Sequence, residues 1–205
     1  KVFLKGAMLI QYPSNADYEL AIKSGDNLYK SISGLVIHPS RTKPIKYYTY
    51  GSGSYAVVFK GSLNQNKVAV RFFLQSSPDI AVRYQKISAY LINKNLSWYN
   101  KVSWFNDEII VNNKSYPMVL MNWAKGIPIN DYIKNNLGDN SALTLLQKQI
   151  IILIDSLENN KVGHGDFQHG NIFIENQNNT IKLSLVDYDN LYVPDLTGLN
   201  SKELG

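Results

Sequence analysis

The sequence contains no cysteine, and only three of its 205 residues are histidine. The missing cysteine excludes a disulfide framework and a cysteine-ligated zinc site. Proteins without disulfides are typical of a reducing compartment, so we predict a cytoplasmic location. Runs of Lys and Arg are missing as well, and the net charge of +5 is spread along the chain. We therefore predict no nucleic-acid partner.

Long hydrophobic runs are also absent, because no apolar stretch approaches the length of about 20 residues that crosses a bilayer. Residues 2–10 are mildly apolar, but Lys5 interrupts them and no clear cleavage sequence follows. We predict neither a signal peptide nor a membrane partner. A chain with 44% hydrophobic residues can bury a core as one domain or as two small lobes. Because it starts at Lys1 and stops abruptly at Gly205, we expect it to be part of a longer protein.

The most informative stretch is 164–171, which has the form H-x-D-x-x-x-x-N. A β-hairpin predicted at 172–186 follows it and ends at Asp187. Phosphoryl transfer needs one carboxylate that orients a hydroxyl, and an amide and a carboxylate that hold Mg²⁺ on the phosphates. Asp166, Asn171 and Asp187 supply this set of groups.

A second candidate site is the stretch 51–58, which has the form G-x-G-x-x-A-x-V between two strand-like segments. Gly51 and Gly53 let the backbone approach phosphates closely, and the small Ala56 keeps the hairpin low over them. A dinucleotide-binding motif would open a helix, whereas Val58 continues a strand, so that motif is excluded. An ordinary β-hairpin turn is the alternative interpretation.

Hydrophobic periodicity and stop signals predict the remaining elements. Helices are predicted at 14–23, 77–91, 129–133 and 141–157. Strands are predicted at 35–37, 67–73, 98–105, 108–111 and 115–123. The predicted caps are Ser14 for the first helix and Ser141 for the last. Ser77-Pro78-Asp79 is predicted to cap the second helix, with Pro78 at its first position.

Taken together, five stretches resemble the protein-kinase-like fold in their order and spacing: 51–58, 68–71, 121–126, 164–171 and 187–189. The resemblance covers residues 46–205 and implies a bilobal α+β fold. It implies a small lobe at 46–123, with an antiparallel sheet and one helix. A hinge and a partial, mainly helical large lobe would follow at 124–205, truncated at its end. Residues 1–45 would be an extension packed on the small lobe.

Four sequences narrow this resemblance: AVR at 69–71, RYQKIS at 83–88, HGDFQHGN at 164–171 and LVDYDNLYVPDLTG at 185–198. They are similar to a group of bacterial kinase-like proteins that have arginine in the usual lysine position, an HGDLQHGN loop and a DYDGM-type sequence. Asn190 departs from that group, which has glycine there.

The resemblance implies ATP and Mg²⁺ as cofactors. Asp166 would be the base or the orienting group for the acceptor hydroxyl, and Asn171 and Asp187 would hold Mg²⁺. Arg71 would touch the phosphates in place of lysine. The remaining nucleotide contacts would come from Gly51, Gly53, Ala56, Val58, Ala69, Met121, Asn122, Ala124 and Phe173.

One feature of kinases is missing. Their small-lobe helix usually carries a glutamate that pairs with the lysine. Between Arg71 and Asn106, however, the only acidic residue is Asp79, at the predicted start of the helix. We expect a serine/threonine protein kinase that acts on a protein substrate. The alternatives are a pseudokinase that works as a regulatory interaction module, and a phosphotransferase for a small-molecule hydroxyl, of the aminoglycoside- or choline-kinase type.

Overall fold

The computed structural model describes residues 11–25, 28–41, 44–77, 79–177 and 180–199. It confirms the predicted α+β class, with an antiparallel sheet and, within these ranges, four α-helices. The chain forms two compact units: the first comprises Lys1–Pro78 and Phe105–Leu120, and the second Asp79–Trp104 and Met121–Gly205. None of the helices within the described ranges has the length and apolar character that a membrane crossing requires.

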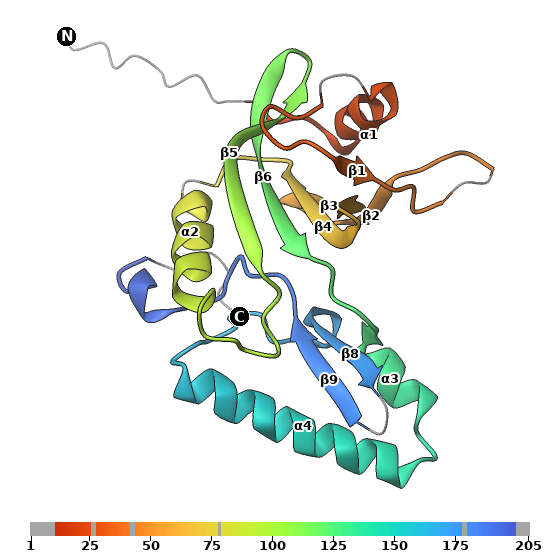
Figure 1. Ribbon diagram of the computed structural model, residues 1–205, viewed down its shortest axis with the longest axis vertical. Helices are drawn as coiled ribbons and strands as arrows, with labels where there is room; N and C mark the ends of the chain where they lie inside the picture. Colours follow the sequence, from red (N-terminus) through yellow and green to blue (C-terminus); the bar gives the residue numbers. More distant parts are fainter. Residues whose placement is uncertain (1–10, 26–27, 42–43, 78, 178–179, 200–205) are drawn as a thin grey trace. The chain divides into compact units, whose positions relative to one another are not determined.

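The first unit is built on a six-stranded sheet of order β1-β3-β4-β6-β5, in which β2 also pairs with β3 (Figure 1). Its strands are β1 (Leu35–Ile37), β2 (Thr49–Ser52), β3 (Ala56–Leu63), β4 (Asn66–Phe73), β5 (Val102–Val111) and β6 (Lys114–Asn122). The β3–β4 hairpin sets the register that matters for the site, because Val58 lies opposite Arg71 and Lys60 opposite Ala69.

Helix α1 (Asn15–Ser24) packs on this sheet, and its bounds confirm the helix predicted at 14–23. Ser14 and Asp17 form a reciprocal capping box, so the start of the helix is fixed by local sequence. Tyr18 is fully buried and stacks on Phe72, with 4.8 Å between the ring centroids. Its hydroxyl donates to the carbonyl oxygen of Phe73 over 2.8 Å, which joins α1 to the end of β4.

The second unit combines helices with a small antiparallel sheet of order β7-β8-β9. Its elements are α2 (Ile80–Leu91), β7 (Ile127–Pro128), α3 (Ile129–Asn135), α4 (Asn140–Asn159), β8 (Ile172–Gln177) and β9 (Thr180–Leu185), with short 3₁₀ turns at His169–Asn171 and Pro194–Leu196. Helix α4 lies along the β8–β9 hairpin and buries Leu146, Leu153 and Leu157 (Figure 1). Helix α2, which the sequence analysis assigns to the small lobe, belongs to this unit.

Three details of the predicted elements are wrong. Helix α2 begins at Ile80 with Asp79 as its N-cap, and that side chain makes no capping hydrogen bond. Helix α4 is capped by Asp139, whose side chain accepts from the backbone N–H groups of Ser141 and Ala142, so Ser141 is not the cap. Strands were predicted separately at 98–105 and 108–111, but a single strand, β5, runs from Val102 to Val111, and residues 98–101 lie outside it.

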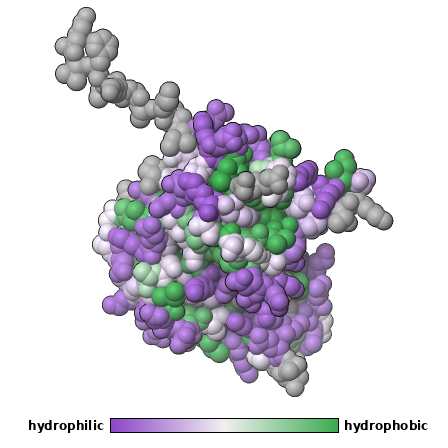
Figure 2. Space-filling model, turned by 45° about the horizontal axis from the view of Figure 1, so that its top comes forward, coloured by the Kyte–Doolittle hydropathy of each residue, from purple (hydrophilic) through white to green (hydrophobic). Residues whose placement is uncertain are grey.

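Hydrophilic residues cover most of the face of the molecule drawn in Figure 2, with smaller hydrophobic areas between them. The main run of exposed apolar side chains within one helix is on α4, where Ile151, Ile152 and Ile154 are all exposed. Single exposed apolar residues are normal on protein surfaces, so they carry no functional signal by themselves.

Candidate functional site

The predicted site residues fall into two groups, one in each unit. In the first unit, strand alternation gives the β3–β4 hairpin two different faces. One face is buried in the core together with Tyr18 and Ile22 of α1; it carries Val57, Phe59, Val68, Val70 and Phe72. The other face carries four of the predicted nucleotide-contacting residues, which are Ala56, Val58, Ala69 and Arg71.

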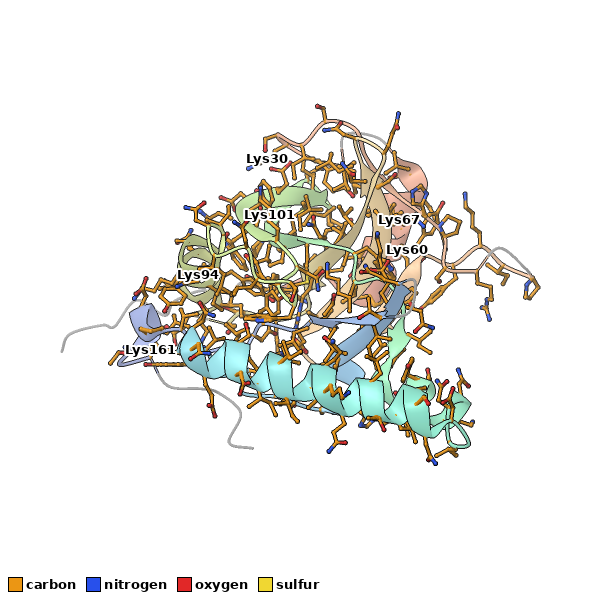
Figure 3. All side chains as sticks on the ribbon, turned by 60° about the horizontal axis from the view of Figure 1, so that its bottom comes forward. Lys30, Lys60, Lys67, Lys94, Lys101 and Lys161 are labelled. Atoms are coloured by element: carbon orange, nitrogen blue, oxygen red, sulfur yellow. The ribbon has the colours of Figure 1, made fainter. Side chains whose placement is uncertain are left out.

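This second face is also cationic. Lys60 lies opposite Ala69, and Lys67 is in the same alternating set as Arg71. Figure 3 labels Lys60 and Lys67. Val58, Ala69 and Arg71 are all half-buried, and the Arg71 guanidinium lies 6.0 Å from the centroid of the Phe73 ring. Three cationic residues on one face of a hairpin favour an anionic ligand there.

The turn that joins β2 to β3 carries Gly51 and Gly53. Neither has a left-handed φ, and a Cβ at either position would meet nothing within 4 Å. Gly53 donates its backbone N–H to the carbonyl oxygen of Ala56 over 2.9 Å, which closes the turn. Neither backbone conformation nor packing among the described residues requires glycine at these two positions, so alanine would fit at both without a clash.

In the second unit, hydrogen bonds from Gly163 and His164 fix the start of the loop that follows α4. Gly163 and Tyr192 exchange two backbone hydrogen bonds, of 3.1 and 2.6 Å. His164 is buried, and its Nε2 donates to the carbonyl oxygen of Val186 over 2.9 Å. Burial lowers the pKa of the imidazole, which outweighs the nearby carboxylates of Asp187 and Asp166. His164 is therefore a neutral residue that holds the loop through its bond to Val186.

Only glycine fits at position 165. Its φ is +75°, and a Cβ there would overlap the carbonyl oxygen of Asn190. The glycine of the H-G-D sequence thus allows the loop to lie directly against the segment that follows β9. The sequence analysis did not identify this contact, because the two residues are 25 positions apart and neither shows a local signal.

Asp166, Asn171 and Gln168 form a connected set. The Nδ2 of Asn171 donates to Oδ2 of Asp166 over 2.8 Å and to its carbonyl oxygen over 3.0 Å. Gln168 Nε2 donates to the same Oδ2 over 2.9 Å. Both donors meet one carboxylate oxygen, so Oδ1 of Asp166 has no donor within the described ranges. A carboxylate fixed in this way can accept a hydrogen bond from a substrate hydroxyl.

The structure also brings Asn171 and Asp187 together. Ile172 pairs with Leu185 in the β8–β9 hairpin, and Val186 donates its N–H to the carbonyl oxygen of Asn171 over 3.0 Å. Asp187 comes next and has φ +63°, in the left-handed region that Asp tolerates better than most residues. Asn171 and Asp187 therefore lie at the same end of one hairpin.

Asn171 and Asp187 are the residues at this end of the hairpin that could hold a magnesium ion. The amide nitrogen of Asn171 is used on Asp166, so its amide oxygen is the atom that could ligate a metal, together with the carboxylate of Asp187. The described residues contain no group of three or more His, Cys, Asp or Glu side chains that could hold a metal by itself. Mg²⁺ commonly binds through one or two side chains plus waters and substrate phosphates, which such a pair allows.

The residues predicted to line the adenine lie along 121–128 and on β8. Met121 and Ala124 are buried, and Asn122 donates its N–H to the carbonyl oxygen of Lys101, so this donor is already used within the unit. Phe173 is half-buried and pairs with Pro128 across β7 and β8. Gly126 has φ +90°, and any side chain there would overlap the backbone of Ile174, so this glycine sets how closely 121–128 approaches β8.

Tyr188, between the two acidic residues of the 187–189 turn, is fully buried. Its hydroxyl accepts from the Asn100 N–H over 2.8 Å and donates to the Leu185 carbonyl oxygen over 2.9 Å. Its ring stacks on Tyr99, with 5.7 Å between centroids. Burial raises the pKa of this phenol far above its ordinary value, so it stays protonated. The tyrosine anchors the turn from which Asp187 extends.

Sequence reasoning missed three residues of this region: Gln168, which holds Asp166; Asn100, which holds Tyr188; and Tyr84 of α2, whose hydroxyl donates to Asp189 over 2.6 Å. Of these, only Gln168 could have been found from the sequence, since it lies two residues after Asp166.

No protein-family model matches the chain, and no match was found among curated proteins.

Proposed function

We propose that the chain is a protein-kinase-like phosphotransferase that moves the γ-phosphoryl group of ATP to a hydroxyl, with serine or threonine of a protein as the acceptor. The observation that carries this proposal is the hydrogen-bonded pair of Asp166 and Asn171, with Asp187 at the same end of the β8–β9 hairpin. Phosphoryl transfer is catalysed mainly by positioning and electrostatic stabilisation, and these three groups supply both.

Each residue has a defined part in the proposed reaction. Asp166 accepts the hydrogen bond, and then the proton, of the acceptor hydroxyl through its unoccupied Oδ1. The hydroxyl oxygen forms a bond to the γ-phosphorus as the bond to the β,γ-bridging oxygen breaks, and ADP leaves with that electron pair. Asn171 and Asp187 would hold Mg²⁺, which would neutralise phosphate charge when bound. Arg71, on the cationic face of the β3–β4 hairpin, contacts the phosphates.

A second candidate is a nucleotide-binding module without catalysis. One observation favours it: α2 contains no acidic residue, so this helix lacks the glutamate that the small-lobe helix of kinases usually carries. Against it stands the ordered Asp166, because a module that only binds nucleotide has no need of an oriented carboxylate.

Binding and turnover measured side by side separate these functions. Mg·ATP binding is measured by calorimetry on the parent and on Asp166→Asn, and ADP release is measured with protein and small-molecule hydroxyl acceptors. Phosphoryl transfer predicts similar binding by both proteins and ADP release by the parent alone. Binding without release by either protein, with any acceptor, supports the non-catalytic module. Release only with a small-molecule acceptor would replace the protein-kinase assignment.

A further inference from the structure

One face of helix α2 is buried within the second unit, and Tyr84 is the polar residue on that face. Ile80, Tyr84, Ile87 and Leu91 recur on one face and are all buried. The Tyr84 ring stacks on Trp104, with 5.9 Å between centroids and 21° between the planes. A tyrosine buried this completely keeps its hydroxyl only where a partner is available, so the identity of that partner is informative.

The partner is Asp189. The Tyr84 hydroxyl donates to Oδ1 of Asp189 over 2.6 Å, although the two residues are 105 positions apart. A separation this short is typical of hydrogen bonds to a carboxylate, which are about twice as strong as neutral ones. Asp189 lies two residues after Asp187, so the bond fixes the far side of the turn that carries the predicted magnesium ligand.

A second bond joins the same helix to the same segment. Lys86 donates through Nζ to the carbonyl oxygen of Asp195 over 2.6 Å. Helix α2 thus holds the chain after β9 at two points, 189 and 195. On the other side of Asp187, the N–H and carbonyl of Val186 are both bonded, to Asn171 and His164. The turn is therefore fixed on both sides of Asp187. Tyr84 makes one of the bonds from α2 that fix the side after Asp187.

We propose that Tyr84 is a positioning residue that sets the place of Asp187 through Asp189, and so couples α2 to magnesium binding. This inference rests on the proposed function for its effect on Mg²⁺. Helix α2 contains no acidic residue that could pair with a cation. In this proposal it contributes the phenol of Tyr84 instead, which orders the acidic turn. The position of α2 then influences the metal affinity of the site through the bond between Tyr84 and Asp189.

The test compares Tyr84→Phe with a matched control, Tyr90→Phe. Both variants remove a hydroxyl from α2 and keep the ring, and the Tyr90 hydroxyl donates to the Asn160 carbonyl oxygen instead. We expect Tyr84→Phe to raise the Mg²⁺ concentration for half-maximal ATP turnover about tenfold, with kcat at saturating Mg²⁺ changed less than about twofold. Tyr90→Phe should change neither.

A second readout does not depend on turnover. Deuterium uptake by residues 187–191 is measured in the nucleotide-free protein, and Tyr84→Phe should raise it while Tyr90→Phe should not. If the parent neither binds nor turns over Mg·ATP, the proposed function fails. Faster exchange in Tyr84→Phe would then still support the positioning of the turn. Unchanged exchange, or equal effects of the two variants, would overturn the role of Tyr84 whatever the function.

Discussion

The side chain of Asn171 binds Asp166 twice, with its Nδ2 2.8 Å from Oδ2 and 3.0 Å from the carbonyl oxygen. This pairing orients two groups at once. The carboxylate is held through Oδ2, and the amide nitrogen of Asn171 is used, which leaves its amide oxygen for another partner. The group proposed to take a proton and one group proposed to hold a cation are therefore parts of one hydrogen-bonded unit, and the account depends on this arrangement.

Asp187→Asn should lower the affinity for Mg·ATP by about 100-fold, because it removes the only carboxylate assigned to the metal. The fold should be unaffected, since Asn tolerates the left-handed φ of this position as well as Asp does. Calorimetry with and without Mg²⁺ measures the effect. Asp195→Asn, an exposed residue of the same segment, is the control and should bind like the parent. Parent-like binding by Asp187→Asn would contradict the metal assignment.

Gly51→Ala and Gly53→Ala should leave the free energy of unfolding within about 0.5 kcal/mol of the parent, because a Cβ meets nothing at either position. The affinity for Mg·ATP should fall about tenfold, the scale of one lost hydrogen bond to a charged group. Denaturant unfolding and calorimetry provide the two measurements. Gly138→Ala, also in open space, should change neither quantity. If the glycine stretch is only a hairpin turn, all three variants will bind alike.

Tyr188→Phe should destabilise the protein by about 1–3 kcal/mol, since it leaves the buried N–H of Asn100 without its acceptor. The ring and its packing on Tyr99 are kept, so the loss reports the hydroxyl alone. Urea unfolding measures it. Tyr192→Phe is the matched control, because its exposed hydroxyl bonds only Thr197 at the surface, and its effect should stay within about 0.5 kcal/mol. Equal effects would show that the Tyr188 hydroxyl has no special role.

The shifted pKa of Glu108 makes the free energy of unfolding depend on pH. It is buried in β5, which raises its pKa. Hydrogen bonds from the Ser31 side chain and the backbone N–H groups of Ser31 and Ile32 outweigh this effect and hold the pKa below its ordinary value. A carboxyl with a lowered folded-state pKa adds stability above its unfolded value, and this stability is lost as the pH falls through the folded pKa.

Glu108→Gln should therefore cost about 1–3 kcal/mol at neutral pH, and the difference from the parent should shrink as the pH falls below about 4.5. Urea unfolding across this range measures it, and Asp107→Asn, an exposed neighbour, should track the parent. A difference that stays constant with pH would show that packing, rather than charge, explains the loss.

The sequence predicted the elements whose signals are local. The capping box at Ser14 and Asp17 and the alternating β4 strand, which carries Arg71, were read correctly because each depends on residues within a few positions. The caps of α2 and α4 were wrong by two residues, since several capping residues compete in each stretch. Strand β5 continues through Asn106 and Asp107, and the neighbouring Glu108 binds Ser31 and Ile32, more than 70 positions away. A local sequence pattern does not show such long-range contacts.

The candidate site likewise has residues that the sequence predicts locally and residues that only the structure brings in. The spacing of Asp166, Asn171 and Asp187 follows from a loop and one hairpin, so the sequence carries it. The residues that support them come from far along the chain: Asn100 on Tyr188, and Tyr84 on Asp189. Such contacts depend on tertiary packing, which periodicity and spacing do not encode.

The most direct test of phosphoryl transfer is the intact mass of the protein after incubation with Mg·ATP and a serine- and threonine-containing protein acceptor, beside Asp166→Asn. The account predicts that the parent adds phosphoryl groups to itself or to the acceptor and that the variant adds none, although it still binds Mg·ATP. Equal phosphorylation by both proteins would show that Asp166 is not the catalytic carboxylate. Its absence from both, with nucleotide bound, would contradict the assignment as a protein kinase.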